Sequence, residues 1–472
     1  MDVFPQHRTA QRALRQGLAQ LVCPGRHTLT GLLGTAGRQW HDWSAEYRLH
    51  SQSPWDSQAP FGPILAGTLD LLAPNAPVVA AMDDTTLRKT GRHAADPGWK
   101  RDPMSPAFRV NFMRGQRFLQ VCVLLPAGPG PCGARGLPIH FQHVPPIPKP
   151  KKSDSKEVWK AYRLKQRQDN LSTRGVAAIA KLRWDLDQTP EGRQRRLIVG
   201  VDGSYTNGHV LRDRPPRTDL IGRLRKDAKL FRLPTPPDPS KRGAKPKYGQ
   251  ALPTPDALRQ DDSIPWQEVM AYAAGKVHPF RVKTVGPVLW KKAGCNLPLR
   301  LIIIAPVGYR LTANSKLLYR QPAYLICTDL TLSLEDILQD YVWRWEIEVN
   351  HRDEKQLIGV GEAQVWNPRA VDHQPALAVA SYSLMLLASA RAFGPDASGR
   401  LTPAPKWQAG QSRRRLSTQE LIQHLRQEMC RYGIEHIQMN INGFVIAPSA
   451  DAKPSNCPPA QTAGLVSGAT GS

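Results

Sequence analysis

The chain has 472 residues, which is too long for one simple hydrophobic core and predicts two or three domains. Hydrophobic residues make up 41% of it, as in globular rather than disordered proteins. Its formal charge of +25 and isoelectric point near 10.0 favour a polyanionic partner, and nucleic acid is the commonest one. A membrane surface is the competing partner, but no long basic amphipathic helix stands out in the sequence.

The apolar segments and the cysteine spacing of the chain indicate its cellular compartment. No apolar stretch reaches the roughly 20 residues needed to cross a bilayer, and the N-terminal residues lack the apolar segment of a secretory signal. The seven cysteines are scattered and include no CxxC pair, which argues against a disulfide framework or a zinc ribbon. We therefore expect a cytoplasmic protein with no membrane segment.

In chain order, residues 1–75 read as a mostly helical region, either a DNA-binding module or a helical cap on the next domain. Residues 76–231 read as the first part of an α/β domain. Short apolar runs bounded by polar turns predict buried strands at 77–82, 118–125, 139–144 and 196–201. A helix with a basic outer face is expected over about 156–187.

The second half begins with a change in composition. Residues 232–321 combine a stretch rich in Pro, Lys, Arg and Gly with strand-like runs, and we interpret them as a β-rich insertion. The second part of the α/β domain follows at 322–395, where Ser333 to Asp336 resembles a capping box that opens a helix. Residues 396–472 form a C-terminal region with an amphipathic helix near 418–431 and a disordered tail.

The helix that opens at Ser333 is predicted to carry a stripe of functional side chains. Tyr341, Arg344, Glu348 and Lys355 have the spacing Y-x2-R-x3-E-x6-K, which places them at about 0°, 300°, 340° and 320° around one helix. A face with one carboxylate, two cations and a phenol suits a site that holds a metal ion and a phosphate. Arg344 and Glu348 also have the spacing of an ordinary ion pair on a solvated helix.

Two further acids follow predicted strands. Asp84 and Asp202 each come at the end of a short buried strand, and Glu348 lies on the helix downstream. Divalent cations bind carboxylate oxygens, and two ions need acids that converge from separate elements. An Asp after a strand is also common in turns. The spacing does not distinguish Asp83 from Asp84.

These motifs resemble the DDE transposases of bacterial insertion sequences, in particular the subgroup with the same Tyr-Arg-Glu-Lys signature. The resemblance spans roughly residues 30–365. It implies a ribonuclease H-like mixed sheet flanked by helices, interrupted by the mainly β insertion. It also implies that Asp84, Asp202 and Glu348 are the catalytic and metal-binding triad, with Asp84 preferred because the acid of the family directly precedes a threonine.

The resemblance further implies how such an enzyme works. It would use two magnesium ions (Mg2+, with Mn2+ as a substitute), cleave double-stranded DNA at terminal inverted repeats and join the ends to target DNA. Tyr341, Arg344 and Lys355 would contact DNA phosphates, and a homodimer would hold two ends together. Two other functions are a DNA-binding regulator that has lost catalysis and a stand-alone nuclease of the same fold.

Three residues near these motifs allow more than one interpretation. Trp290 either stacks on an unpaired base or belongs to the core. His351 either assists the site or is a surface histidine. Asn350 stands in a segment where relatives usually have an aromatic residue soon after the glutamate, which leaves the local packing open.

Overall fold

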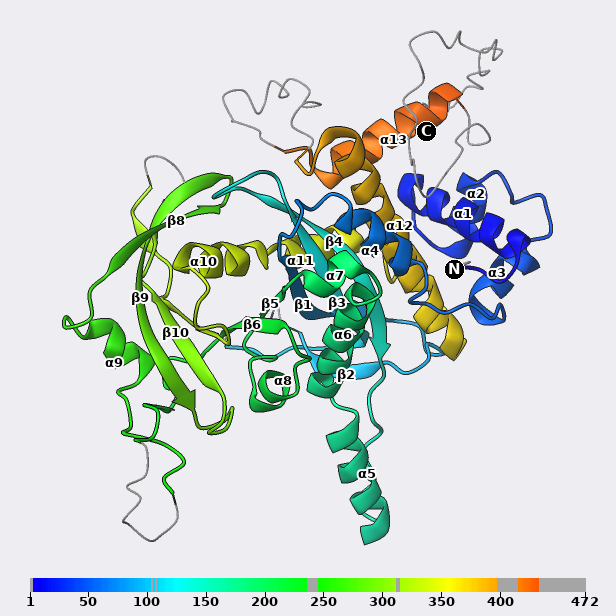
Figure 1. The fold of residues 1–472 in the computed structure, drawn as a ribbon. Helices are drawn as coiled ribbons and strands as arrows, with labels where there is room; N and C mark the ends of the chain where they lie inside the picture. The colour runs from blue at the N-terminus through cyan, green and yellow to red at the C-terminus, as the bar shows by residue number, and fades with distance from the viewer. Residues whose placement is uncertain are drawn as a thin grey trace, which may run out of the picture.

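The computed structural model describes residues 3–102, 105–106, 108–235, 245–310, 315–396 and 415–432. The fold is mixed α/β, with one large mixed sheet flanked by helices, which confirms the expected class (Figure 1). The mainly helical character of the N-terminal region is also as expected. The helices are α1 (His7–Val22), α2 (Leu29–Thr35), α3 (Ser44–Ser51), α4 (Phe61–Leu69), α5 (Lys156–Gln168), α6 (Leu171–Leu186), α7 (Pro190–Gln194), α8 (Gly208–Arg212), α9 (Pro255–Gln260), α10 (Leu334–Trp343), α11 (Glu346–Gln356), α12 (Pro368–Phe393) and α13 (Thr418–Tyr432).

The strands follow a consistent order across the sheet. They are β1 (Val78–Arg88), β2 (Gly98–Arg101), β3 (Phe112–Pro126), β4 (Ala134–Val144), β5 (Leu197–Val201), β6 (Thr218–Arg223), β7 (Leu230–Phe231), β8 (Gln267–Ala273), β9 (Lys276–Trp290), β10 (Pro298–Ile304), β11 (Gly308–Tyr309), β12 (Leu318–Tyr319) and β13 (Ala323–Cys327). Their order in the large sheet is β2-β3-β1-β5-β6-β13-β10-β9-β7, with β4 paired to β3 and β8 to β9.

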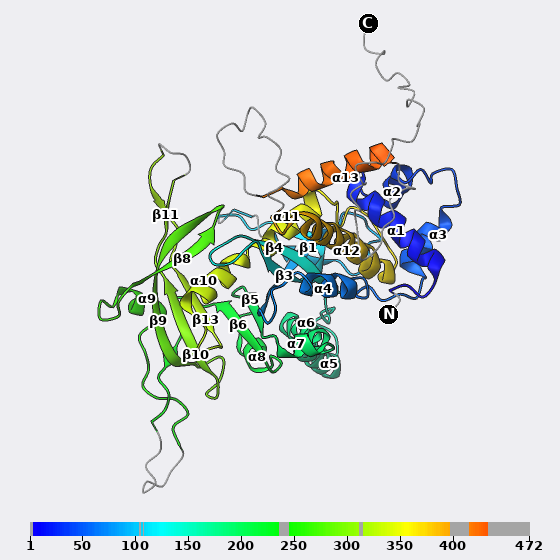
Figure 2. The same ribbon diagram turned by 45° about the horizontal axis from the view of Figure 1, so that its top comes forward.

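The part of the sheet from β4 to β6 has the pattern of a ribonuclease H-like fold. β4, β3 and β1 pair antiparallel, and β1, β5 and β6 then pair parallel. α6 connects β4 to β5 and packs on one face of the sheet, whereas α11 packs on the other (Figures 1 and 2). β13 pairs antiparallel with β6 and joins the strands of the 232–321 segment to the same sheet.

The first strand is longer than predicted. It was expected to end at residue 82, but β1 continues to Arg88 because β3 pairs with it along that whole length. β5, in contrast, pairs only with Val78 to Met82. Asp83 and Asp84 therefore lie inside a strand, at the point where one of its two neighbours has ended.

Two predicted helices are each broken into two, so those predictions were wrong in that respect. The helix expected over 156–187 is interrupted after Gln168, and the Asn170 side chain caps the new helix by accepting a hydrogen bond from the Thr173 backbone N–H at 3.0 Å. The helix with the Tyr-Arg-Glu-Lys signature ends at Trp343, and α11 starts at Glu346. Between them, the N–H of Trp345 bonds three residues back to Val342, which tightens the turn.

α12 is the central helix of the second half of the chain. It packs against β4 and against the N-terminal helices α1, α3 and α4 (Figure 2). Among the described residues it alone is long and apolar enough to cross a membrane by length and composition, but 72% of that apolar stretch is buried inside the protein. Because this helix is largely buried, its apolar sequence is explained by its place in the protein core.

A buried polar cluster joins α1 to α3. His50 is 1% exposed, and its Nε2 lies 2.7 Å from Gln16 Oε1. The Gln16 amide also donates to Glu46, at 2.9 Å to the carboxylate. Burial lowers the pKa of His50 to about 3, so its imidazole stays neutral in the folded protein.

The low pKa of His50 predicts that the packing of the N-terminal helices becomes less stable at acid pH. Below a pH of about 6.5 the unfolded chain takes up a proton at His50 and the folded chain does not, so stability is lost as the pH falls, by up to about 1.4 kcal/mol per pH unit. In urea denaturation, the unfolding free energy of the wild type should therefore fall relative to that of His50→Gln as the pH is lowered from 7 to 5. A difference that stays constant with pH would contradict the prediction.

Candidate active site

The parallel pairing of β1 with β5 determines which acids meet. Met82 lies beside Val201 in the register of the two strands, so the next residues along, Asp83 and Asp202, are neighbours. Neighbouring residues in a parallel pair point to the same face of the sheet. Burial and the nearby Asp202 carboxylate raise the pKa of Asp83 to about 7, although Arg344 opposes the shift.

Asp83 faces α11. Its antiparallel partner on β3 is Gln120, whose side chain donates to Glu354 of α11 at 2.8 Å. On the same side, the Arg344 guanidinium lies 3.7 Å from the Asp83 carboxylate and donates to Glu348 at 3.0 Å. The structure therefore places Arg344 between Asp83 and Glu348, with Asp202 next to Asp83.

Asp84 points to the opposite face, because successive residues of a strand point to opposite sides of the sheet. Its carboxylate pairs with Arg117 at 3.0 Å and accepts a hydrogen bond from the Tyr205 hydroxyl at 3.1 Å. Tyr205 packs toward α6, since a Cβ at Gly175 would lie 3.2 Å from its ring. The preference for Asp84 over Asp83, which came from the resemblance, thus selected the residue that the sheet turns away from Asp202 and Glu348.

Asp202 is held in a tight turn after β5. One of its carboxylate oxygens accepts hydrogen bonds from the Ser204 backbone N–H at 2.9 Å and from the Ser204 hydroxyl at 2.7 Å. Such an Asx turn is the structural role that an Asp after a strand commonly has. Here the turn fixes the carboxylate beside Asp83.

The Tyr-Arg-Glu-Lys residues do not form one continuous stripe. Arg344 lies at the break between α10 and α11, with its guanidinium 5.6 Å from the centre of the Tyr341 ring. Gly200 of β5 faces this side chain, since a Cβ there would lie 3.4 Å from Arg344, in ordinary van der Waals contact. The Arg344 Nε and Nη1 are buried and have no hydrogen-bond partner. Nη1 lies 3.7 Å from the Asp83 carboxylate, so the guanidinium is held between Asp83 and Glu348 by this ion pair and by its hydrogen bond to Glu348.

Lys355 lies two turns beyond Glu348 and borders a basic groove of about 690 Å³. The groove runs along the edge of β1 that β5 leaves open, between β2 and the loop after α11. Burial and the neighbouring Arg117 lower the pKa of Lys100 in this groove to about 8, which reflects crowding of positive charge. Its charged lining comprises the cations Arg26, Arg88, Lys100, Arg101, Arg117 and Lys355, and the acids Asp84, Asp102 and Glu362.

Sequence reasoning missed most of this groove. Apart from Lys355, its cations come from β1, β2, β3 and the loop after α1, and no spacing in the sequence unites them. Only the overall charge of +25 indicated that such a surface exists. The lining becomes apparent only once the strands are paired.

Burial decides the interpretation of Trp290 and changes the description of His351. Trp290 is 6% exposed and belongs to the main core, so it is a core residue rather than a base-stacking one. His351 is half-buried instead of fully exposed, and burial together with the nearby Lys355 and Arg344 lowers its pKa to about 3. Its ring is therefore neutral and does not add to the positive charge of the site.

Asn350 holds α11 against β4. It is 1% exposed, donates to the Gly136 carbonyl at 3.1 Å and accepts from the Tyr382 hydroxyl of α12 at 3.1 Å. Gly136 is required there, because a Cβ would lie 3.0 Å from both Asn350 and Glu346. The asparagine that replaces the expected aromatic residue thus packs by hydrogen bonding across three elements.

Comparison with known proteins gives the class of this chain. A family model described as "DDE superfamily endonuclease" matches residues 1–292, which is more than half of the chain. The chain therefore belongs to the DDE superfamily of endonucleases, a family that acts on DNA and typically uses divalent metals. The match includes Asp83 and Asp202 and ends before Glu348. No curated protein matched the chain.

We predict that Asn350→Ala loosens α11. The change leaves the Gly136 carbonyl and the Tyr382 hydroxyl without their partner, and each buried polar group left unpaired costs about 1–3 kcal/mol. Urea denaturation should give an unfolding free energy lower by at least about 2 kcal/mol. Gln356→Ala, at an exposed position of the same helix, is the control and should change it by less than about 0.5 kcal/mol.

Proposed function

We propose that the protein is a transposase that uses metal-dependent phosphoryl transfer to cleave DNA at transposon ends and to join the ends to target DNA. The observation that carries the proposal is the position of Asp83 beside Asp202, with Arg344 lying between Asp83 and Glu348 on the side of the sheet that faces α11. Membership of the DDE superfamily supports DNA as the substrate.

In this proposal the first catalytic acid is Asp83 rather than Asp84. Asp83 lies beside Asp202 and faces α11, whereas Asp84 is paired to Arg117 and Tyr205 on the other face. Asp202 and Glu348 keep the roles that the resemblance implied.

These residues fit a divalent metal site by their chemistry. Carboxylate oxygens are the ligands that Mg2+ and Mn2+ prefer, and a cation would offset the burial and the nearby Asp202 charge that raise the pKa of Asp83. Among the described residues no three acids are close enough to form a ready-made metal site, since Arg344 is paired with both Asp83 and Glu348. Asp83, Asp202 and Glu348 would hold two ions, which would supply activation of the attacking hydroxyl and stabilisation of the leaving oxygen.

The neighbouring residues would bind and orient the DNA. Arg344 has a planar guanidinium, which suits bidentate contact with a phosphate. Tyr341 lies against that guanidinium and would hold its orientation. Lys355 and the basic groove would bind the phosphates further along the strand.

Two other functions make different predictions. A regulator that has lost catalysis would bind DNA without cleaving it, and the retention of all three acids in one place counts against it. A stand-alone nuclease would cleave DNA without joining its ends. The transposase proposal includes recognition of inverted repeats, synapsis by a homodimer and action in the cytoplasm.

The acids provide the decisive test. Purified protein with Mg2+ should cleave a plasmid that carries the DNA flanking its coding region on both sides, and chelation of the metal should stop cleavage. Asp83→Asn and Glu348→Gln should each lower the rate at least about 100-fold while DNA binding remains. Asp84→Asn should lower it by less than about tenfold, because it removes an ion pair outside the acid cluster.

Gel separation of the products distinguishes the functions. Joined products in addition to cleaved ones support the transposase, and cleaved products alone support the nuclease. Cleavage that survives Asp83→Asn but is lost in Asp84→Asn would overturn the assignment of the first acid. Binding with no cleavage by the wild type would indicate a regulator.

A further inference from the structure

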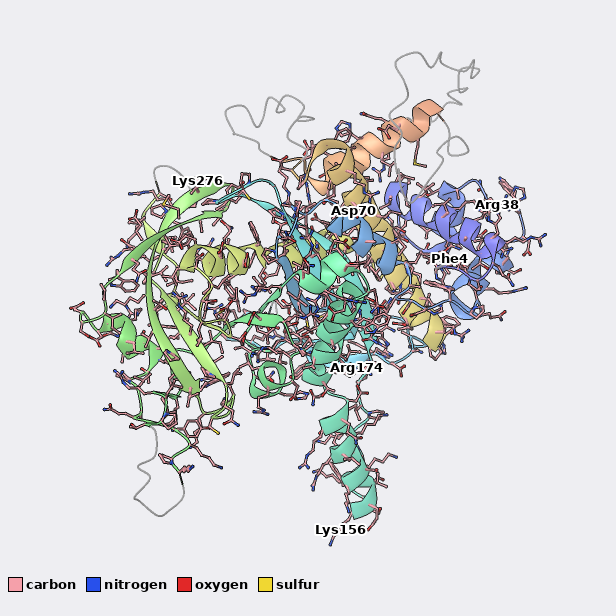
Figure 3. All side chains as sticks on the ribbon, viewed as in Figure 1. Phe4, Arg38, Asp70, Lys156, Arg174 and Lys276 are labelled. Carbon is pink, nitrogen blue, oxygen red and sulfur yellow. The ribbon has the colours of Figure 1, made fainter. Side chains whose placement is uncertain are left out.

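α5 projects from the body of the protein and has no buried residue. The helix is 13 residues long, about 20 Å, and Lys156 marks its far tip (Figures 1 and 3). Val158 and Leu164 are 47% and 54% exposed. An isolated helix of this length is marginally stable in water, so a projecting one is best explained by a partner that it contacts.

One face of α5 is a continuous row of cations. Lys156, Lys160, Arg163 and Arg167 fall at about 0°, 40°, 340° and 20° around the helix. All four are exposed, and within the described part of the chain none forms an ion pair or a side-chain hydrogen bond. We call these four residues the arm stripe. They cover about 17 Å along the helix axis with positive charge.

The joint at the base of the arm is fixed. Arg174 of α6 donates twice to the Asp169 carboxylate, at 2.6 and 3.0 Å, in a bidentate ion pair. The Asn170 side chain caps α6 and also donates to the Arg167 carbonyl at 3.1 Å. These contacts hold the direction of α5 relative to α6, so the arm is attached as a defined extension (Figure 3).

The arm leaves the protein at the edge where the acids lie. α6 leads from β4 to β5, and β5 runs parallel to β1, so a connecting helix that returns across the sheet starts near the ends of both strands. Two contacts agree with this: Asn207, in the loop after Asp202, donates to Ser172 at 2.9 Å, and His209 contacts Thr173 at 3.1 Å.

We infer that α5 is a DNA-binding arm, whose stripe contacts the phosphate backbone of the duplex that enters the active site. The inference rests on the proposed function, because it assumes that DNA reaches the acids. Residues 145–168 contain eight lysines and arginines against two acids, which matches a polyanion. A second copy of this chain, itself charged at +25, is a poor electrostatic match for the arm.

The test measures binding without cleavage. Wild type and a quadruple variant, with Lys156, Lys160, Arg163 and Arg167 all changed to Gln, are titrated in a metal chelator against a fluorescent duplex of about 40 base pairs. Because each phosphate contact contributes about 0.9 to the slope of log affinity against log salt, the variant should lose about 3 to 4 from that slope. Its affinity at about 0.1 M salt should fall at least tenfold.

A matched pair of single variants tests whether the loss of DNA binding comes from the arm stripe. Lys160→Gln should weaken binding about threefold, whereas Lys165→Gln, about 180° from the stripe, should leave it unchanged. Glutamine keeps a good helix propensity and nothing in α5 is buried, so folding is preserved and circular dichroism should confirm it.

Each other outcome has its own meaning. A wild type that does not bind duplex contradicts the proposed function itself. A wild type that binds, with a quadruple variant of the same affinity and salt slope, overturns the role of the arm alone. If sedimentation shows that the variant loses self-association while its DNA affinity is unchanged, the arm binds a second copy instead, and the inference is wrong.

Discussion

The site depends on the register between two parallel strands. Because Met82 pairs with Val201, the residues that follow them, Asp83 and Asp202, are brought together where β5 ends and β1 continues. The same difference in strand length leaves an edge of β1 open, and the basic groove lies along that edge. The difference in length between β1 and β5 thus creates both the pair of acids and the basic groove that borders it. A shift of one residue would separate the acids and turn β1 over.

The existence of the helices and strands could be predicted from the sequence better than the residues at which they begin and end. The strand before Asp202, the helix with Glu348 and the N-terminal helices were all recognisable from periodicity and capping. The length of β1 was not, because it depends on pairing with β3, far along the chain. For the same reason the family resemblance selected Asp84, whereas strand direction places Asp83 toward α11. Local patterns contain the residue types of a site, but the face on which a residue lies is a property of the assembled sheet.

Buried polar residues connect the elements around the site. Lys89, at the end of the long β1, is 1% exposed and donates to the carbonyls of Gly361 and Ala363, at 2.8 and 2.9 Å. Asn350 does the same for α11, β4 and α12. Such bonds are directional, so they fix one arrangement of helix and strand where apolar contacts alone would allow several. The positions of β1 and α11, which carry Asp83 and Glu348, are therefore fixed by the buried polar contacts beneath them.

The continuity of the sheet has a consequence for shortening this protein. β10 covers one edge of β13, and β13 covers one edge of β6. Removing residues 232–321 would take β10 away and leave the hydrogen-bonding groups of β13 facing solvent. An exposed, apolar strand edge is a template for pairing with other molecules. A minimal version of the protein would thus gain a tendency to aggregate, and the added strands act as a cover for the ribonuclease H-like sheet as well as an extension of it.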